Sequence, residues 1–205
     1  MATSGWRDVW RRFKGRGAYP HQLAFLLLVP LRSLIFSPRQ LAARLHLTAT
    51  SRVLELGPGP GFFSAYIARR VPDGHLCLVD LQREMLEKAR ARIRRAGVAN
   101  VSFAQASASA LPFAGEVFDA AFLVTVLGEV PEAATCVVAL RDALRPGGLL
   151  SITELAGDPD AMTESKVAAL AKAAQLEHAE TFAMRFGFTI NFRKAGASTR
   201  APQGR

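Results

Sequence analysis

The sequence predicts an α/β fold, a doubly wound and mostly parallel sheet with helices on both faces and an antiparallel C-terminal edge strand. Short apolar runs alternate with segments of helical periodicity, which is the pattern of parallel strands buried on both faces. The first of these runs ends in three alternating glycines. A glycine-rich turn of this kind connects a strand to the following helix in folds that bind a ligand at that turn. Only a tight turn separates residues 177–183 from 186–194, so these two strand-like segments are expected to pair antiparallel.

The expected elements follow from where each apolar pattern starts and stops. Before the closing pair, the expected strands are 52–56, 76–79, 101–105, 118–124 and 149–154. The expected helices are 21–36, 38–45, 62–70, 82–96, 131–144 and 163–175. Ser37 is placed to cap the second helix, Pro38 fits its first turn, and Gly97 ends the fourth. Residues 145–148, with the sequence Arg-Pro-Gly-Gly, are expected to form a turn.

Composition divides the 205 residues into four parts around one domain. The parts are a mobile basic N-terminus (1–17), an N-terminal helical segment (18–48), the α/β domain (49–194) and a disordered tail (195–205). The net charge of +9 is concentrated in the first part and in the expected helix 82–96. Such basic patches attract phosphates, but they are more often solvated faces.

An uncharged apolar run, residues 23–31, follows the basic N-terminus. It is too short to span a bilayer, which takes about 20 apolar residues. Arg32 and Arg39, and the absence of a small-residue cleavage site close behind, argue against a signal peptide. Two interpretations remain open. The segment is a lid over a substrate pocket, which we favour, or it lies in a membrane surface as a peripheral contact.

The two cysteines indicate a reducing compartment. Cys77 and Cys136 both lie inside apolar segments, as small core residues do, so a cytoplasmic and possibly membrane-associated location is expected. The four histidines are scattered and form no Cys/His cluster with zinc spacing, so no metal site is expected.

The glycine turn and an acid beyond it point to a nucleoside-containing cofactor. Glu55 precedes Gly57-x-Gly59-x-Gly61, whereas a dinucleotide site would need a glycine at position 62, which is a phenylalanine. The sequence also lacks a Tyr-x-x-x-Lys pair, so a nicotinamide oxidoreductase is disfavoured. Asp80 ends the neighbouring strand, where a carboxylate can accept hydrogen bonds from both hydroxyls of a ribose.

With these motifs, residues 50–155 resemble the class I S-adenosylmethionine-dependent methyltransferases, which have a Rossmann-like fold. The resemblance implies S-adenosyl-L-methionine as cofactor, with Gly57 and Gly59 near its methionine part, Glu55 at its amino group and Leu81 on its adenine. The start at Tyr19-Pro20-His21 and the end at 191–194 resemble a little-characterised subgroup. The expected cofactor-binding residues are Glu55, Gly57, Pro58, Gly59, Gly61, Asp80, Leu81, Ser107, Ala108 and Thr125.

One position departs from the family pattern. Ser107 stands where many members have an aspartate that meets the adenine amino group. A hydroxyl can accept a hydrogen bond but carries no charge, so a lower cofactor affinity is expected.

The expected catalytic residues are Glu129 and His21, with Glu154 as a further candidate base. A base is needed only where the acceptor atom must lose a proton. Glu129 follows the fourth strand at the carboxyl edge of the sheet, although it could instead favour the start of the next helix. His21 would act if its segment closes over the site, although it could be a helix cap. Asp119 starts its strand, on the opposite edge, and is expected to be structural.

The residues after the fourth strand limit the acceptor. They are Val-Thr-Val-Leu, and not the Asn/Asp-Pro-Pro-Tyr-like motif that accompanies methylation of nucleic-acid bases in this family, so nucleic acid is disfavoured. Two buried-looking cysteines cannot serve arsenic methylation. We therefore expect methyl transfer to O, N or C of a small, lipophilic molecule. The alternative is a non-catalytic cofactor-binding or partner-binding protein on the same fold. The oligomeric state is left open.

Overall fold

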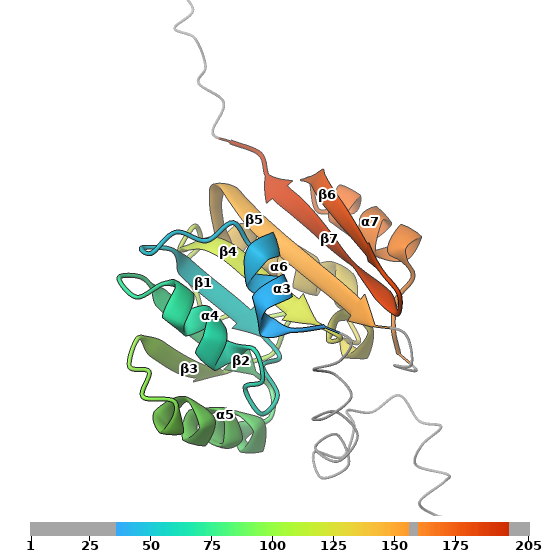
Figure 1. Cartoon of the computed structure of the whole chain (residues 1–205). Coiled ribbons are helices and arrows are strands. Elements are labelled where there is room, and N and C mark those ends of the chain that lie inside the picture. Colours follow the sequence, from blue (N-terminus) through green and yellow to red (C-terminus); the bar gives the residue numbers. More distant parts are fainter. Residues whose placement is uncertain (1–35, 156–159, 197–205) are drawn as a thin grey trace, which may run out of the picture.

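The computed structural model describes residues 36–155 and 160–196, which form one seven-stranded sheet in the order β3-β2-β1-β4-β5-β7-β6 (Figure 1). The strands are β1 (Arg52–Leu56), β2 (His75–Asp80), β3 (Val101–Gln105), β4 (Phe118–Val124), β5 (Leu144–Leu155), β6 (Leu176–Met184) and β7 (Gly187–Lys194). The first five strands run parallel, and β7 lies antiparallel between β5 and β6. The predicted fold class is confirmed.

The helices also follow the sequence pattern. They are α3 (Pro38–Arg44), α4 (Ser64–Arg70), α5 (Arg83–Arg95), the short 3-10 helix η1 (Leu127–Glu129), α6 (Ala133–Ala143) and α7 (Glu164–Ala173). The start of α3 is fixed by reciprocal hydrogen bonds, since Gln40 N donates to Ser37 Oγ (3.2 Å) and Ser37 N donates to Gln40 Oε1 (2.9 Å). The expected helix 21–36, except for Phe36, and most of the expected tail lie outside the described residues.

Several bounds shift by one or two residues, and two differences from the prediction have a clear structural cause. The helix expected from residue 62 begins at Ser64, because residues 61–63 complete the glycine turn. The turn expected at 145–148 is wrong, because β5 already begins at Leu144 and includes these residues. Leu144 pairs with Phe118, and the register then shifts before Leu149 pairs with Ala120. Gly147, with φ of +78°, lies in this irregular stretch, so the Pro-Gly-Gly sequence marks a bulge in a strand.

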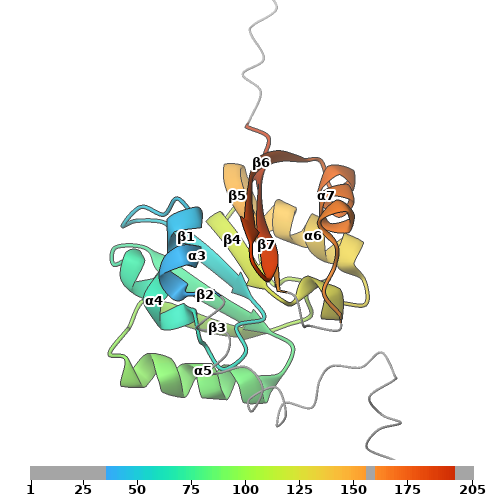
Figure 2. The same ribbon diagram turned by 45° about the vertical axis from the view of Figure 1, so that its right-hand side comes forward.

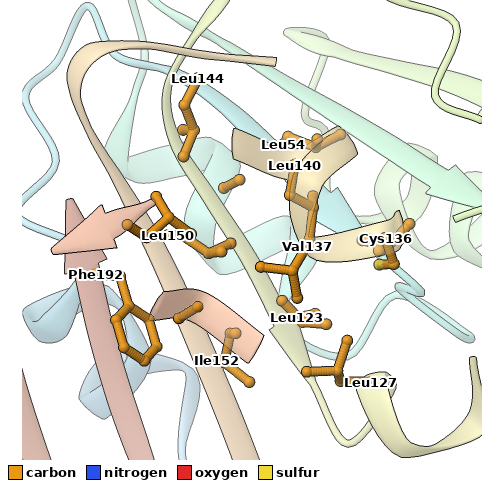
Figure 3. Close-up of a cluster of buried hydrophobic side chains, with 14 of the residues drawn as sticks. Leu54, Leu123, Leu127, Cys136, Val137, Leu140, Leu144, Leu150, Ile152 and Phe192 are labelled. Atoms are coloured by element: carbon orange, nitrogen blue, oxygen red, sulfur yellow. The ribbon is translucent and has the colours of Figure 1, made fainter. Parts of the chain in front are cut away.

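Helices cover both faces of the sheet (Figure 2). One face carries α3, α4 and α5, and the other carries α6 and α7. Figure 3 shows the larger core, in which Val137 and Leu140 of α6 pack onto Leu54, Leu123 and Ile152 of the sheet. Cys77 and Cys136 are buried and unbridged, as expected. Among the described residues, no helix has the length and apolarity that crossing a bilayer requires.

The topology brings the carboxyl ends of β1, β2, β4 and β5 to one edge of the sheet. Asp119 lies at the opposite edge, where its carboxylate accepts from Arg52 N (2.7 Å) and pairs with Arg145 Nη1 (2.7 Å). This confirms that Asp119 is structural, and it leaves the carboxyl edge as the place for a site.

Candidate functional site

The three glycines after β1 have different physical reasons to be glycine. Gly57, Gly59 and Gly61 all have positive φ, at +64°, +51° and +76°. A Cβ on Gly57 would lie 2.5 Å from Val126 Cγ2, and one on Gly61 would lie 3.1 Å from Ala89 Cα of α5. Among the described residues, no atom lies within 4 Å of a Cβ built on Gly59. Two glycines therefore serve packing, and Gly59 faces open space beside the turn.

Glu55 is a buried acid with an unsatisfied oxygen. Its side chain is 2% exposed on β1, and its Oε2 has no hydrogen-bond partner within the described chain. Burial raises the pKa of Glu55 to about 8; the Ser64 hydroxyl opposes this shift and the negative charge of Asp80 adds to it. A buried acceptor without a donor is costly, so a cationic donor fits here. The amino group of S-adenosylmethionine is such a donor.

Asp80 connects the glycine turn to the start of α5. Its Oδ1 accepts from Gln82 N at 2.8 Å. Burial raises the pKa of Asp80, and hydrogen bonds from the backbone N–H groups of Gln82, Gly59 and Leu81 oppose that rise. The next residue, Leu81, is 63% exposed, although large apolar side chains are usually covered. An acid that can hold a ribose thus lies beside an apolar surface that can pack against a base.

The chain leaves β4 in a strained conformation. Thr125 has φ of +54°, which costs a β-branched residue about 1–3 kcal/mol. Its N–H donates to Thr153 O (2.8 Å), and its hydroxyl donates to Val124 O (2.7 Å). This bend directs Val126 onto Gly57. Backbone strain of this kind is common at functional sites. Here the strained residue follows β4 and brings the next residue, Val126, against Gly57 at the end of β1.

Two of the expected cofactor residues come from the loop after β3. Ala106 N donates to Asp80 O (3.2 Å), which holds this loop near the end of β2. The Ser107 hydroxyl is exposed and accepts from Ser109 N (3.3 Å), and Ala108 is half-buried against the core. Pro58, within the glycine turn, is buried.

The three candidate bases, Glu129, Glu154 and His21, differ in where they lie. Glu129 ends η1 at the carboxyl edge and is exposed. Glu154 is 2% exposed and lies opposite Phe188 in the β5–β7 ladder, one residue before the end of β5. His21 lies outside the described residues. Within residues 36–155 and 160–196, no three His, Cys, Asp or Glu side chains are grouped to hold a metal ion.

Sequence reasoning missed three contributors to this edge. Ser64, buried at the start of α4, lies beside Glu55. Val126 fills the space that Gly57 leaves. Gln105 Nε2 donates to Leu81 O at 3.1 Å. Ser64 and Gln105 could have been found from their places, directly after the glycine turn and at the end of β3, whereas Val126 looks like any apolar residue.

Comparison with known proteins matches part of the chain to a family. Residues 53–148 match the family model described as "Methyltransferase domain". Curated relatives include the ubiquinone/menaquinone biosynthesis C-methyltransferase UbiE of Pasteurella multocida, which is 36% identical over 105 residues, 50% of this chain and 39% of that protein. The UbiE of Vibrio campbellii is 37% identical over 105 residues, 50% of this chain and 40% of that protein. The match thus spans about two fifths of these relatives.

Solved structures share the fold at low identity. A SAM-dependent methyltransferase from Aquifex aeolicus superposes with a TM-score of 0.80 and 19% identity, covering 86% of this chain and 99% of that one. The 1,6-didemethyltoxoflavin-N1-methyltransferase of Burkholderia thailandensis gives 0.68 and 20%, covering 95% and 92%. The [4+2]-cyclase SpnF gives 0.70 and 19%, covering 78% and 81%. Residues 53–148 are therefore similar to a methyltransferase domain, and the chain has the fold of the class I S-adenosylmethionine-dependent methyltransferases.

Proposed function

We propose that this chain is an S-adenosylmethionine-dependent methyltransferase that acts on O, N or C of a small, lipophilic acceptor. The observation that carries the proposal is the pair of acids beside the glycine turn, the buried Glu55 of β1 and the partly buried Asp80, which accepts a hydrogen bond from Gly59 N. One acid has an unsatisfied oxygen for an amino group, and the other is held by backbone N–H groups for a ribose. The family match over residues 53–148 supports the same cofactor.

The cofactor supplies a methyl group that its sulfonium has already activated. The chain's own residues hold the cofactor, align the acceptor and exclude water. In this proposal Glu55 accepts hydrogen bonds from the amino group, Asp80 accepts them from the ribose hydroxyls, and Leu81 packs on the adenine. The turn around the methionine part of the cofactor is formed by Gly57, Pro58, Gly59 and Gly61. The walls of the cofactor site are completed by Ser107, Ala108 and Thr125.

Proton removal is assigned to Glu129 where the acceptor requires it. Its place at the end of η1, directly after β4, and its exposure support this role. His21 is the second candidate. Phe36, where the described chain begins, lies 5.7 Å from Phe63 between ring centroids, next to the glycine turn. This contact supports residues 18–48 as a lid on the domain of residues 49–194.

We propose a cytoplasmic location, with a peripheral membrane contact through the N-terminal segment. Two buried cysteines that form no disulfide support a cytoplasmic location. The basic and apolar N-terminus supports a peripheral membrane contact, and flotation with anionic liposomes, compared with a variant lacking residues 1–35, tests it. A nucleic-acid substrate has no support from the residues after β4.

The rival function is cofactor or partner binding without methyl transfer. Two observations favour it: the Ser107 hydroxyl is engaged with Ser109 N, and the fold also occurs in a [4+2]-cyclase. Turnover of lipophilic acceptors separates the two functions, because the rival predicts cofactor binding with no methylated product.

The test is calorimetric titration of the full-length protein with S-adenosylhomocysteine, with NAD as the comparison. We expect binding of S-adenosylhomocysteine alone, lost in Asp80→Ala and kept in Glu84→Ala, an exposed acid on α5. Absence of binding at millimolar concentration in the folded wild type would refute the proposal.

A further inference from the structure

Arg44, at the end of α3, is a cation that the protein surrounds with aromatic rings. Its guanidinium carbon lies 4.9 Å from the ring centroids of both Phe36 and Phe182. None of the ion pairs formed among residues 36–155 and 160–196 involves Arg44. Arg44 is partly buried, and this burial lowers the pKa of its guanidinium because it disfavours the charged form. A partly buried charge without a counter-ion is unfavourable, so an anion would be stabilised beside it.

Only one of the three nitrogens of the Arg44 guanidinium donates hydrogen bonds within the described chain. Its Nη1 donates to Thr189 Oγ1 (2.6 Å) and to Met184 Sδ (3.3 Å). The backbone O of Arg44 accepts from Asn191 Nδ2 (2.7 Å), which ties the end of α3 to β7. Neither Nε nor Nη2 makes a hydrogen bond within the described chain. These contacts fix the group in place and leave one edge of its donor fork free.

Arg44 lies near the carboxyl ends of β4 and β5. Thr189 Oγ1 lies 2.8 Å from Thr153 Oγ1, and Thr153 O accepts from the strained Thr125 (2.8 Å) at the end of β4. On its other side, Phe36 contacts Phe63, next to the glycine turn. Figure 1 shows α3 on the sheet between α4 and the β6–β7 hairpin. Arg44 is thus connected to both walls of the candidate site.

We propose that Arg44 binds a carboxylate of the acceptor, so that the substrate class is a small lipophilic carboxylic acid. This inference rests on the proposed function and names the acceptor class for the same site. A planar carboxylate matches the planar fork of arginine, and the two phenylalanine rings provide an apolar collar around the charged pair. The collar disfavours a strongly hydrated anion such as phosphate.

The experiment compares two ligands of equal shape on the full-length protein. Binding of 2-naphthoate and of 2-naphthylmethanol is measured by calorimetry, with and without S-adenosylhomocysteine. The wild type should bind the carboxylate at least about tenfold more tightly than the alcohol, as expected for a charge-assisted pair. Arg44→Gln should remove this preference, and Arg44→Lys should reduce it, because lysine keeps the charge without the fork. Arg83→Gln, which removes an exposed arginine from the Arg83–Glu87 pair, should retain it.

Two results would overturn the inference. One is a wild type that binds both ligands equally. The other is Arg44→Gln weakening both ligands by the same factor, since a purely structural arginine would do that. Should Arg44→Gln fail to fold, the wild type and Arg44→Lys carry the comparison. Titration with S-adenosylhomocysteine is scored separately, so failure of cofactor binding is distinguishable from failure of carboxylate recognition.

Discussion

Replacing Glu55 by glutamine should stabilise the ligand-free protein, by an amount that grows with pH. The pKa of this carboxyl rises from 4.5 to about 8 on folding, so the folded state holds a proton that the unfolded state loses. At about 1.36 kcal/mol per pKa unit, the raised pKa of Glu55 lowers the free energy of unfolding by about 5 kcal/mol well above pH 8 and by about 3 kcal/mol at pH 7, where the folded state still holds the proton. The free energy of unfolding of the wild type should therefore fall as pH rises from 4.5 to 8, and Glu55→Gln should not show this component.

The assay is urea unfolding of both proteins without ligand at pH 5, 7 and 9. Their difference should be small at pH 5 and should reach several kcal/mol at pH 9. Glu84→Gln, an exposed acid of α5, serves as the control for a changed charge. A difference between Glu55→Gln and the wild type that stays constant with pH would refute the assignment of a proton to buried Glu55.

Cofactor binding should favour the ionised form of the Glu55 carboxyl, whereas folding without the cofactor favours the protonated form. A cationic amino group requires the ionised form of Glu55, so binding at pH 7 should release about 0.9 proton, and the Kd should fall about tenfold per pH unit from 6 to 7. Titration with S-adenosylhomocysteine in buffers of different ionisation enthalpy counts that proton. Glu55→Gln should bind weakly and without this pH dependence. Equal proton release by the variant would show that another group is responsible.

Three further substitutions test the fold around the site. Gly57→Ala should destabilise by more than about 1 kcal/mol in urea unfolding, because of its positive φ and its contact with Val126, and Val126→Ala in the same chain should recover part of the loss. Leu140→Ala should cost about 2–5 kcal/mol in the same assay, because it leaves a cavity in the core under α6. Asp119→Asn should change stability by about 1 kcal/mol or less, because the Arg145 pair is partly exposed, and should leave the Kd for S-adenosylhomocysteine unchanged.

Local patterns predicted the parallel half of the sheet well. The bounds of β1, β3 and β4 match the expected ranges, because each is a short apolar run with polar or glycine neighbours. The start of β5 was missed because Arg-Pro-Gly-Gly has the composition of a turn, and only the pairing of Leu144 with Phe118 makes it a strand.

The candidate site divides in the same way. Ligands bind at the carboxyl ends of parallel strands, and this rule predicted that Glu55, Asp80 and Glu129 lie at the same edge of the sheet. The roles of these three acids stay predictions. The collar around Arg44 could not be predicted, because Thr189 lies 145 residues away in the sequence and meets Arg44 only when the β6–β7 hairpin docks beside β5. The strain at Thr125 likewise depends on a bond to Thr153 from another strand.

The cofactor end and the acceptor end of the candidate site are built from different elements. The cofactor end is built around the glycine turn, where Gly61 packs on α5 and Asp80 accepts hydrogen bonds from Gly59 and Gln82, so a change there alters the turn itself. The Arg44 end joins α3 to β6 and β7, which do not contribute to that turn. Substitutions at Arg44 or Phe182 should therefore change the acceptor without changing the Kd for S-adenosylhomocysteine, whereas substitutions at Asp80 should change that Kd for every acceptor.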